Sequence, residues 1–240
     1  MNQDFYLSTE EAVQKIMDEY KKMTSMFIHE LRNPLSLIKG TLQYIEMKHP
    51  ETKGYKYWGQ LFELIDEMEK MMSDASMLNA CATLKMEHTN LLNLIQGVVN
   101  NYKPQAENQQ KQLSLKISPE CESVITSYYC DPAKIRQVMS NLIKNALEAT
   151  SPGNFIEIVI SIDSVNARPM LSVQVNNNGP KIPEDQIGNI LKPFVTYKKG
   201  GSGIGLALVK RIVDNHMGSI SVFSTDALTS FNILLPLYES

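Results

Sequence analysis

The chain has 240 residues, of which 43% are hydrophobic and 8% aromatic, as is ordinary for a globular protein of one large or two modest domains. A formal net charge of −3 without long runs of like charge argues against a nucleic-acid or membrane surface. Three cysteines without a CxxC pair indicate reduced thiols, and no apolar run approaches the roughly 20 residues that span a bilayer. We therefore expect a cytoplasmic protein, whose membrane association would require a partner or a segment outside this chain.

The first predicted element is a long helix that begins near Ser8 or Thr9 and continues to Lys48. Its apolar residues step by three and four positions, as in a heptad seam, and the phase of the seam shifts at His29. Pro34 removes one backbone hydrogen bond and favours a bend beside this histidine. The seam positions are 13, 16, 20, 23 and 27, and then 31, 35, 38, 42 and 45.

A second helix is predicted after the break at His49-Pro50-Glu51, with apolar positions at 58, 61, 65, 68, 72 and 75. Two such helices form an antiparallel hairpin over residues 1–80. A single hairpin buries too little apolar surface, and pairing of two hairpins into a four-helix bundle is the simple remedy. The sequence therefore predicts a homodimer.

Residues 81–90 are polar and irregular and are interpreted as a linker. Beyond it, residues 91–240 mix helical and strand patterns, which predicts an open mixed sheet covered on one face by helices. The predicted helices are 91–109, 131–150 and 203–216. The predicted strands are 112–118, 123–129, 154–162, 170–176, 219–224 and 229–235.

His29 and Glu30 lie side by side in the middle of the first helix. Imidazole is nucleophilic at neutral pH, and an adjacent carboxylate can take its ring proton or fix its tautomer, so this pair suits attack on phosphorus. By themselves the two residues are more often an ordinary surface pair, because adjacent His and Glu residues are common. The second half of the chain has to decide between these interpretations.

Two amides, Asn141 and Asn145, lie four residues apart on one face of the predicted helix 131–150. Amide oxygens are suited to Mg²⁺ that keeps several waters and is otherwise held by phosphates. The alternative is a pair of half-buried amides bonded within the protein. The glycine-rich loop 198–207 precedes a helix whose first N–H groups and dipole can receive phosphate, although such a loop alone often only turns the chain.

Together these segments resemble the transmitter of a two-component sensor histidine kinase of the HisKA type, with a GHKL ATPase fold. The resemblance begins near residue 20 and rests on FIHELRNPL, NLIKNALEA and KPFVTYKKGGSGIGLALVKRIV, in the order and spacing of that family. It implies an α+β protein: a two-helix hairpin that dimerises into a four-helix bundle, followed by an α/β sandwich of the Bergerat type. ATP and Mg²⁺ are the implied cofactors.

The resemblance also assigns roles to individual residues. His29 would be the phosphorylated histidine, Glu30 its proton acceptor, and Asn33 would act in dephosphorylation of the partner. Asn145 would ligate Mg²⁺. The implied nucleotide-binding set is Asn141, Asn145, Asn177, Gly179, Lys198, Gly201, Gly203, Gly205 and Leu206.

Two motifs depart from the family pattern. The family's DxGxG motif reads Asn177-Asn178-Gly179-Pro180-Lys181 here, so the aspartate that accepts hydrogens from the adenine amino group is an asparagine. A neutral amide loses a charge-assisted hydrogen bond, and we expect ATP affinity to fall by about 1 to 2 kcal/mol. The family's Gly-x-Gly-Thr pattern also becomes Asp226-Ala227-Leu228-Thr229.

The resemblance implies a protein histidine kinase that phosphorylates His29 from Mg-ATP and passes the phosphoryl group to an aspartate of a response-regulator receiver domain. The alternative is a phosphorelay transferase or docking protein whose ATPase-like domain has lost the nucleotide. An ATP hydrolase of the same fold is disfavoured because position 141 lacks the glutamate that activates water there. Fewer than 20 residues precede the matched region, too few for a folded input domain, so we expect the signal to arrive through a separate sensor or inhibitor protein, through the short N-terminal helix or through a segment outside this chain.

Overall fold

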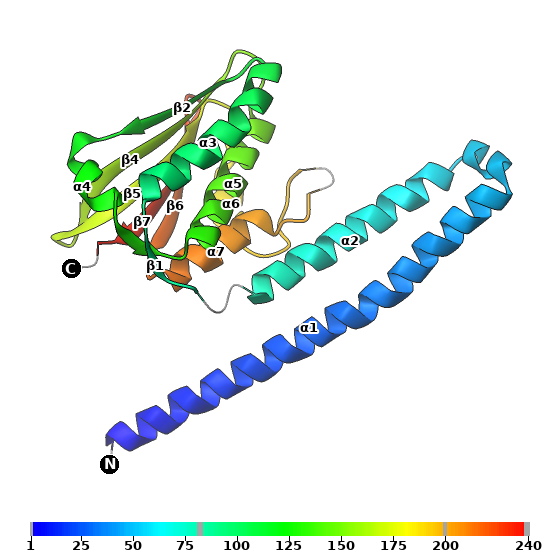
Figure 1. The fold of residues 1–240 in the computed structure, drawn as a ribbon, viewed down its shortest axis with the longest axis horizontal. Coiled ribbons are helices and arrows are strands. Elements are labelled where there is room, and N and C mark those ends of the chain that lie inside the picture. Colours follow the sequence, from blue (N-terminus) through cyan, green and yellow to red (C-terminus); the bar gives the residue numbers. More distant parts are fainter. Residues whose placement is uncertain (1, 81–83, 199–200, 238–240) are drawn as a thin grey trace. The chain divides into compact units, whose positions relative to one another are not determined.

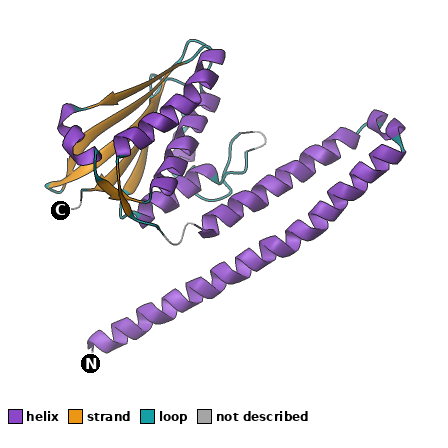
Figure 2. Cartoon of the chain, viewed as in Figure 1, coloured by secondary structure: helices purple, strands orange, loops and turns teal. Residues whose placement is uncertain are grey.

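The computed structural model describes residues 2–80, 84–198 and 201–237. The chain divides into two compact units, Met1–Ala80 and Cys81–Ser240. The described residues of the first unit are helices and their connection, and those of the second combine a sheet with helices (Figures 1 and 2). No helix in the described part of the chain is both long and apolar enough to cross a membrane.

The first unit is a helical hairpin of α1 (Asn2–Lys48) and α2 (Trp58–Ala80). The two helices are joined by the short 3-10 helix η1 (Pro50–Gly54), which begins after His49 as the Pro50 break predicts. Helix α1 starts at Asn2, ahead of the predicted start, and continues through Pro34. The figures show α1 and α2 running antiparallel (Figure 1).

The contact between the two helices is a small apolar core of buried Ile28, Leu35, Ile65 and Met72, with Leu42 and Ala75 packed against it. The seam predicted from sequence is therefore divided between two faces. Leu35, Leu42, Ile65, Met72 and Ala75 face the partner helix, whereas Phe27, Leu31, Ile38, Leu61 and Met68 are exposed. Ile28 lies outside the predicted seam but is buried. The phase of the apolar spacing changes near His29, so Ile28 faces α2 in place of its neighbour Phe27.

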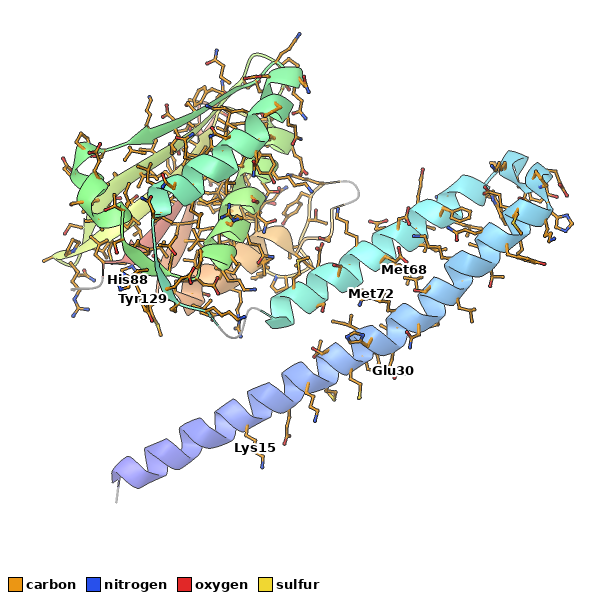
Figure 3. All side chains as sticks on the ribbon, viewed as in Figure 1. Lys15, Glu30, Met68, Met72, His88 and Tyr129 are labelled. Atoms are coloured by element: carbon orange, nitrogen blue, oxygen red, sulfur yellow. The ribbon has the colours of Figure 1, made fainter. Side chains whose placement is uncertain are left out.

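The exposed apolar residues of the hairpin border a groove of about 310 Å³. It is lined by Leu31, Pro34, Leu35, Ile38, Met68, Met71 and Met72. Figure 3 labels Met68 and Met72 on α2. Lys39 also links the two helices, because its ammonium group lies 2.8 Å from an Asp66 oxygen and 2.7 Å from a Glu69 oxygen.

The second unit contains a five-stranded mixed sheet in the order β2-β4-β5-β7-β6. Strands β2 and β4 are parallel, and the other neighbouring pairs are antiparallel. The strands are β2 (Gln112–Ile117), β4 (Phe155–Val165), β5 (Arg168–Asn177), β6 (Ser219–Ser224) and β7 (Thr229–Pro236). Alternate residues of β4 and β5, such as Ile156, Ile158 and Val173, point into the core.

Three helices cover one face of this sheet: α3 (Leu91–Asn108), α5 (Pro132–Ala149) and α7 (Gly205–Asn215) (Figures 1 and 2). Helix α5 begins at its predicted place because the side chain of Asp131 accepts a hydrogen bond from the Lys134 N–H and caps the helix. Its apolar face is buried, as Leu142 and Ile143 show. The predicted open mixed sheet with helices on one face is confirmed.

The predicted strand at 123–129 is wrong for most of its length. The chain there forms a 3-10 helix η2 (Pro119–Cys121), a short helix α4 (Glu122–Ile125) and then β3 (Tyr128–Cys130). The buried residues Cys121, Ile125 and Tyr128 follow helical spacing, a signal that the β-branched composition of the segment obscured. Strand β3 pairs with β1 (Glu87–Thr89), which lies in the segment interpreted as a linker, and α6 (Glu184–Ile187) was not predicted.

Candidate functional site

His29, Glu30 and Asn33 occupy the exposed side of α1. Ile28 turns toward α2, with 6% of its surface exposed, so the residues that follow it point away from the hairpin core. Glu30 is labelled on α1 in Figure 3. An exposed imidazole on a helix is accessible to a phosphoryl donor, and a carboxylate is its neighbour in sequence.

The polar residues of the second unit converge on one face of α5. Asn141, Asn145 and Ala149 follow one another at intervals of four residues and therefore lie along one side of the helix. A different segment of the chain approaches each of them. These segments are the start of α7, the loop at Lys198 and the turn after β5.

The start of α7 lies against Asn141. A Cβ atom at Gly205 would lie 3.4 Å from Asn141 Oδ1, so the amide and the first turn of α7 are in close contact. Leu206 lies in the same first turn, and Ile204 caps α7 without a side-chain hydrogen bond. The first N–H groups of α7 are thus not capped by the side chain at its N-terminus, as an anion site at a helix end requires.

Lys198 lies over Asn145. Its ammonium group is 3.3 Å from Asn145 Oδ1 and 2.8 Å from Glu148 Oε2. The Asn145 oxygen thus accepts a hydrogen bond from a cationic group in this structure. A metal ligand has to present its oxygen to a cation in a similar way. Glu148 is not among the predicted site residues, although its position three residues after Asn145, on the exposed side of the helix, indicates it.

The glycine loop before α7 depends on Gly203. This residue has φ of +67°, and a Cβ atom on it would lie 2.6 Å from the carbonyl carbon of Phe194 and 2.7 Å from the Val195 backbone nitrogen. A side chain is therefore excluded both by conformation and by space. A Cβ atom on Gly201 would lie 2.5 Å from the Thr196 hydroxyl oxygen and 3.3 Å from the Lys198 carbonyl oxygen, so this position is also crowded.

Asn177 ends β5 and is almost completely buried, with 2% of its surface exposed. Within the described part of the chain its Nδ2 atom has no hydrogen-bond partner. The turn that follows lies against the last turn of α5, because a Cβ atom on Gly179 would be 2.6 Å from the Ala149 carbonyl oxygen and 2.9 Å from Asn177 Nδ2. Lys181, which stands where the family's DxGxG motif has its second glycine, is exposed.

Thr229 is a further residue at this end of the sheet that the predicted set did not include. It lies opposite Asn177 in the β5–β7 register, is buried, and its hydroxyl is 2.6 Å from that of Ser224. Ser224 in turn accepts a hydrogen bond from the Ile182 N–H. The register between two strands that are distant in sequence brings these residues together, and no local pattern indicates it.

The donor set suits a nucleotide. The unpaired amide of Asn177 can bond a base, the start of α7 can bond phosphate, and Asn145 offers an oxygen to a cation. In the described ranges no cluster of three or more His, Cys, Asp or Glu side chains could hold a metal ion. A divalent cation here would therefore take most of its ligands from phosphates and water.

Comparison with known proteins agrees with this donor set. Residues 130–239 match the family described as histidine kinase-, DNA gyrase B-, and HSP90-like ATPase, so this part of the chain is an ATPase domain of that family. Sporulation kinase A of Bacillus subtilis is 33% identical over 211 residues, which cover 87% of this chain and 33% of that protein. The sensory histidine kinase/phosphatase NtrB of Rhizobium meliloti is 30% identical over 228 residues, covering 89% and 58%.

Solved structures give the same result. The catalytic domain of histidine kinase ThkA has 28% sequence identity and a TM-score of 0.57, over 64% of this chain and 97% of that one. Full-length ShkA in complex with AMPPNP shares the fold, with 19% identity and a TM-score of 0.71 over 91% of this chain and 46% of that one. The chain is thus a transmitter region with a GHKL-type ATPase domain, similar to those of sensor histidine kinases. It spans from about a third to three fifths of the two curated relatives.

Proposed function

We propose that this chain is an ATP-dependent protein histidine kinase that phosphorylates His29. The single observation that carries the proposal is the combination, in one chain, of an exposed His29 beside Glu30 with a domain of the histidine kinase ATPase family. Neither feature is informative alone, because surface histidines are common and the ATPase family also includes proteins of other functions. Together they provide a phosphoryl acceptor and a nucleotide site.

In the proposed reaction a ring nitrogen of His29 attacks the γ-phosphorus of ATP. The bond between this phosphorus and the β,γ-bridging oxygen breaks, ADP leaves, and Glu30 takes the ring proton. Asn145 would hold Mg²⁺, which neutralises charge on the phosphates. Asn141, Lys198 and the first N–H groups of α7 would hold the phosphates in place, since such transfers depend mainly on positioning and charge neutralisation.

Each of the two units has its own proposed function. Residues 1–80 would form the dimerisation and phosphoacceptor domain, residues 81–90 a linker and residues 91–240 the catalytic domain. The exposed apolar residues of the hairpin support a homodimer through a four-helix bundle, because a free hairpin would leave the groove beside Ile38 and Met68 in water. We propose a cytoplasmic location for this dimer.

The proposed phosphoryl acceptor from His29 is an aspartate of a response-regulator receiver domain. Asn33 lies one helical turn beyond His29 on the same exposed side, where its amide could orient a water for dephosphorylation of that partner. We propose that a separate sensor or inhibitor protein delivers the signal that regulates this kinase.

A relay or docking protein without ATP is the second candidate, and the observation that favours it is Asn177 in place of the family's aspartate. In that case His29 would shuttle phosphate between receiver domains. The buried amide of Asn177 has no protein partner in the described part of the chain, which favours a site that still binds a base.

Labelling with γ-³²P-ATP separates the two candidates. The kinase predicts acid-labile, base-stable label on the wild type, none on His29→Gln, and none on Asn145→Ala. The relay predicts label only from a phosphorylated receiver domain, with Asn145→Ala still active. Wild-type protein that gains no label from ATP while binding Mg-ATP would contradict the kinase.

A further inference from the structure

We propose that Asn177 allows the nucleotide site to accept purines with either an amino or an oxo group at position 6, so that inosine nucleotides bind about as well as adenosine nucleotides. The inference rests on the proposed function, because it requires that the base of a nucleotide reaches Asn177. It adds a substrate class, the 6-oxopurine nucleotides, to the adenine nucleotides implied by the ATPase family.

The first support is that no described residue fixes the orientation of the Asn177 amide. The side chain is 2% exposed, and its Nδ2 atom is buried without a partner in the ranges that the structure describes. A buried donor without a hydrogen bond is costly, so the site favours a ligand that supplies one. The Asn177 amide is therefore available to adapt to the ligand.

The second support is that two polar residues beside Asn177, Asn178 and Thr229, already have hydrogen-bond partners. Asn178 Oδ1 accepts a hydrogen bond of 2.7 Å from the Phe155 N–H, and its carbonyl oxygen accepts one of 2.7 Å from Asn154 Nδ2. Thr229, opposite Asn177 in the sheet, bonds Ser224 at 2.6 Å. Asn176 Oδ1 is also buried without a partner in the described residues, but Asn176 is the preceding residue of β5, so its side chain lies on the opposite face of the sheet from that of Asn177.

An amide can serve both kinds of purine because it carries an acceptor and a donor side by side. In one orientation Oδ1 accepts from the 6-amino group of adenine and Nδ2 donates to N1. In the flipped orientation Nδ2 donates to the 6-oxo group of hypoxanthine and Oδ1 accepts from its N1–H. Both arrangements form two hydrogen bonds, so neither base leaves a polar group of the amide unpaired.

A carboxylate at the same position would discriminate. It accepts only, so it bonds the 6-amino group of adenine but places an oxygen against the 6-oxo group of hypoxanthine. A site built for a specific hydrogen bond rejects ligands that leave its groups unpaired. The exchange of aspartate for Asn177 relative to the family pattern therefore changes selectivity as well as affinity.

Gly179 leaves the space beside the amide open. A Cβ atom at this position would lie 2.9 Å from Asn177 Nδ2. A side chain there would press against one end of the amide and favour one orientation.

The test is isothermal titration calorimetry of the full chain with ADP and with IDP, in the presence of Mg²⁺. For the wild type we expect the two dissociation constants to agree within about threefold. For Asn177→Asp we expect IDP to bind about tenfold or more weakly than ADP, since hydrogen bonds to charged groups are the stronger ones. Asn178→Asp is the matched control: it adds the same charge one residue away, keeps an acceptor for the Phe155 N–H, and should retain the wild-type ratio.

Wild-type protein that binds ADP at least tenfold more tightly than IDP would overturn the inference and leave the proposed function standing. If neither nucleotide binds, the proposed function fails and the inference fails with it. The wild-type ratio decides the matter even if Asn177→Asp does not fold. An equal change of the ratio in Asn178→Asp would show that charge alone, without the orientation of an amide, sets selectivity, which also contradicts the proposal.

Discussion

The ammonium group of Lys198 donates to the side-chain oxygen of Asn145 at 3.3 Å, across 53 positions of sequence. Glu148, one turn further along α5, holds the same ammonium group at 2.8 Å. The ammonium group of Lys198, which is proposed to bind the phosphates, thus contacts Asn145 Oδ1, the oxygen that is proposed to bind Mg²⁺. Nucleotide binding has to move it, because a metal ion and an ammonium group cannot share that oxygen's position.

Replacement of Glu148 by Gln should strengthen Mg-ADP binding about two- to fivefold, because the carboxylate no longer competes with phosphate for Lys198 and an exposed ion pair contributes about 0.2 to 1 kcal/mol. The measurement is calorimetry on four proteins: wild type, Glu148→Gln, Lys198→Met and the double variant. The gain should disappear when Lys198 is absent. An equal gain in the Lys198→Met background would mean that Glu148 acts only by repelling the phosphates.

Replacement of Gly203 by Ala should abolish nucleotide binding and destabilise the catalytic unit. A left-handed conformation costs a residue with a side chain about 1 to 2 kcal/mol, and here the new Cβ atom would also lie 2.6 Å from the Phe194 backbone. Gly153→Ala is the control, because Gly153 has φ of +86° and no atom near its Cβ position. Urea unfolding and ADP titration should show a smaller loss of stability and unchanged binding for Gly153→Ala. Similar binding by both variants would contradict the role given to the loop.

His216 should make the stability of the catalytic unit depend on pH. Its Nε2 accepts a hydrogen bond of 3.1 Å from the Asp131 N–H, and its Nδ1 donates one of 2.8 Å to the Ile212 carbonyl oxygen. Burial lowers the pKa of His216 below its usual value. The unfolded chain therefore binds the proton more readily, and the contribution of His216 is full above about pH 6.5 and is lost as pH falls from there toward the folded pKa.

His216→Gln tests this, because a glutamine amide can keep both hydrogen bonds without titrating. The free energy of unfolding, measured in urea at pH 7.5, 6.0 and 5.0, should fall less steeply for the variant than for the wild type. The difference in slope is at most about 1.4 kcal/mol per pH unit for one proton. Parallel curves for wild type and His216→Gln would contradict the assignment.

Replacement of Ile38 by Glu should dissociate the proposed homodimer, because it places a charge in the apolar groove that a second hairpin would cover. Light scattering during gel filtration should show a monomer, and circular dichroism an unchanged helix content. Phe223→Glu, at an exposed residue of β6, is the control and should remain dimeric. A monomeric wild type, or an Ile38→Glu dimer, would contradict the four-helix bundle.

Local spacing was enough to predict the elements that carry the site. The interval of four between Asn141 and Asn145 fixed them on one helix face, and Asp131 followed by Pro132 marked the start of α5. Helical periodicity also predicted the hairpin that bears His29. These features depend on backbone geometry over one or two turns, which the sequence alone determines. The short helix α4 was missed because its composition resembled that of a strand.

Only the tertiary structure decided which other segments of the chain contact these helix faces. It placed Lys198 on Asn145 and Glu148, Gly179 on Ala149, and Thr229 opposite Asn177. It also divided the hairpin seam into a buried and an exposed side and left the Asn177 amide without a protein partner in the described ranges. Such contacts join segments that are distant in sequence, and their geometry follows from sheet register and the packing of the whole core, which no local pattern encodes.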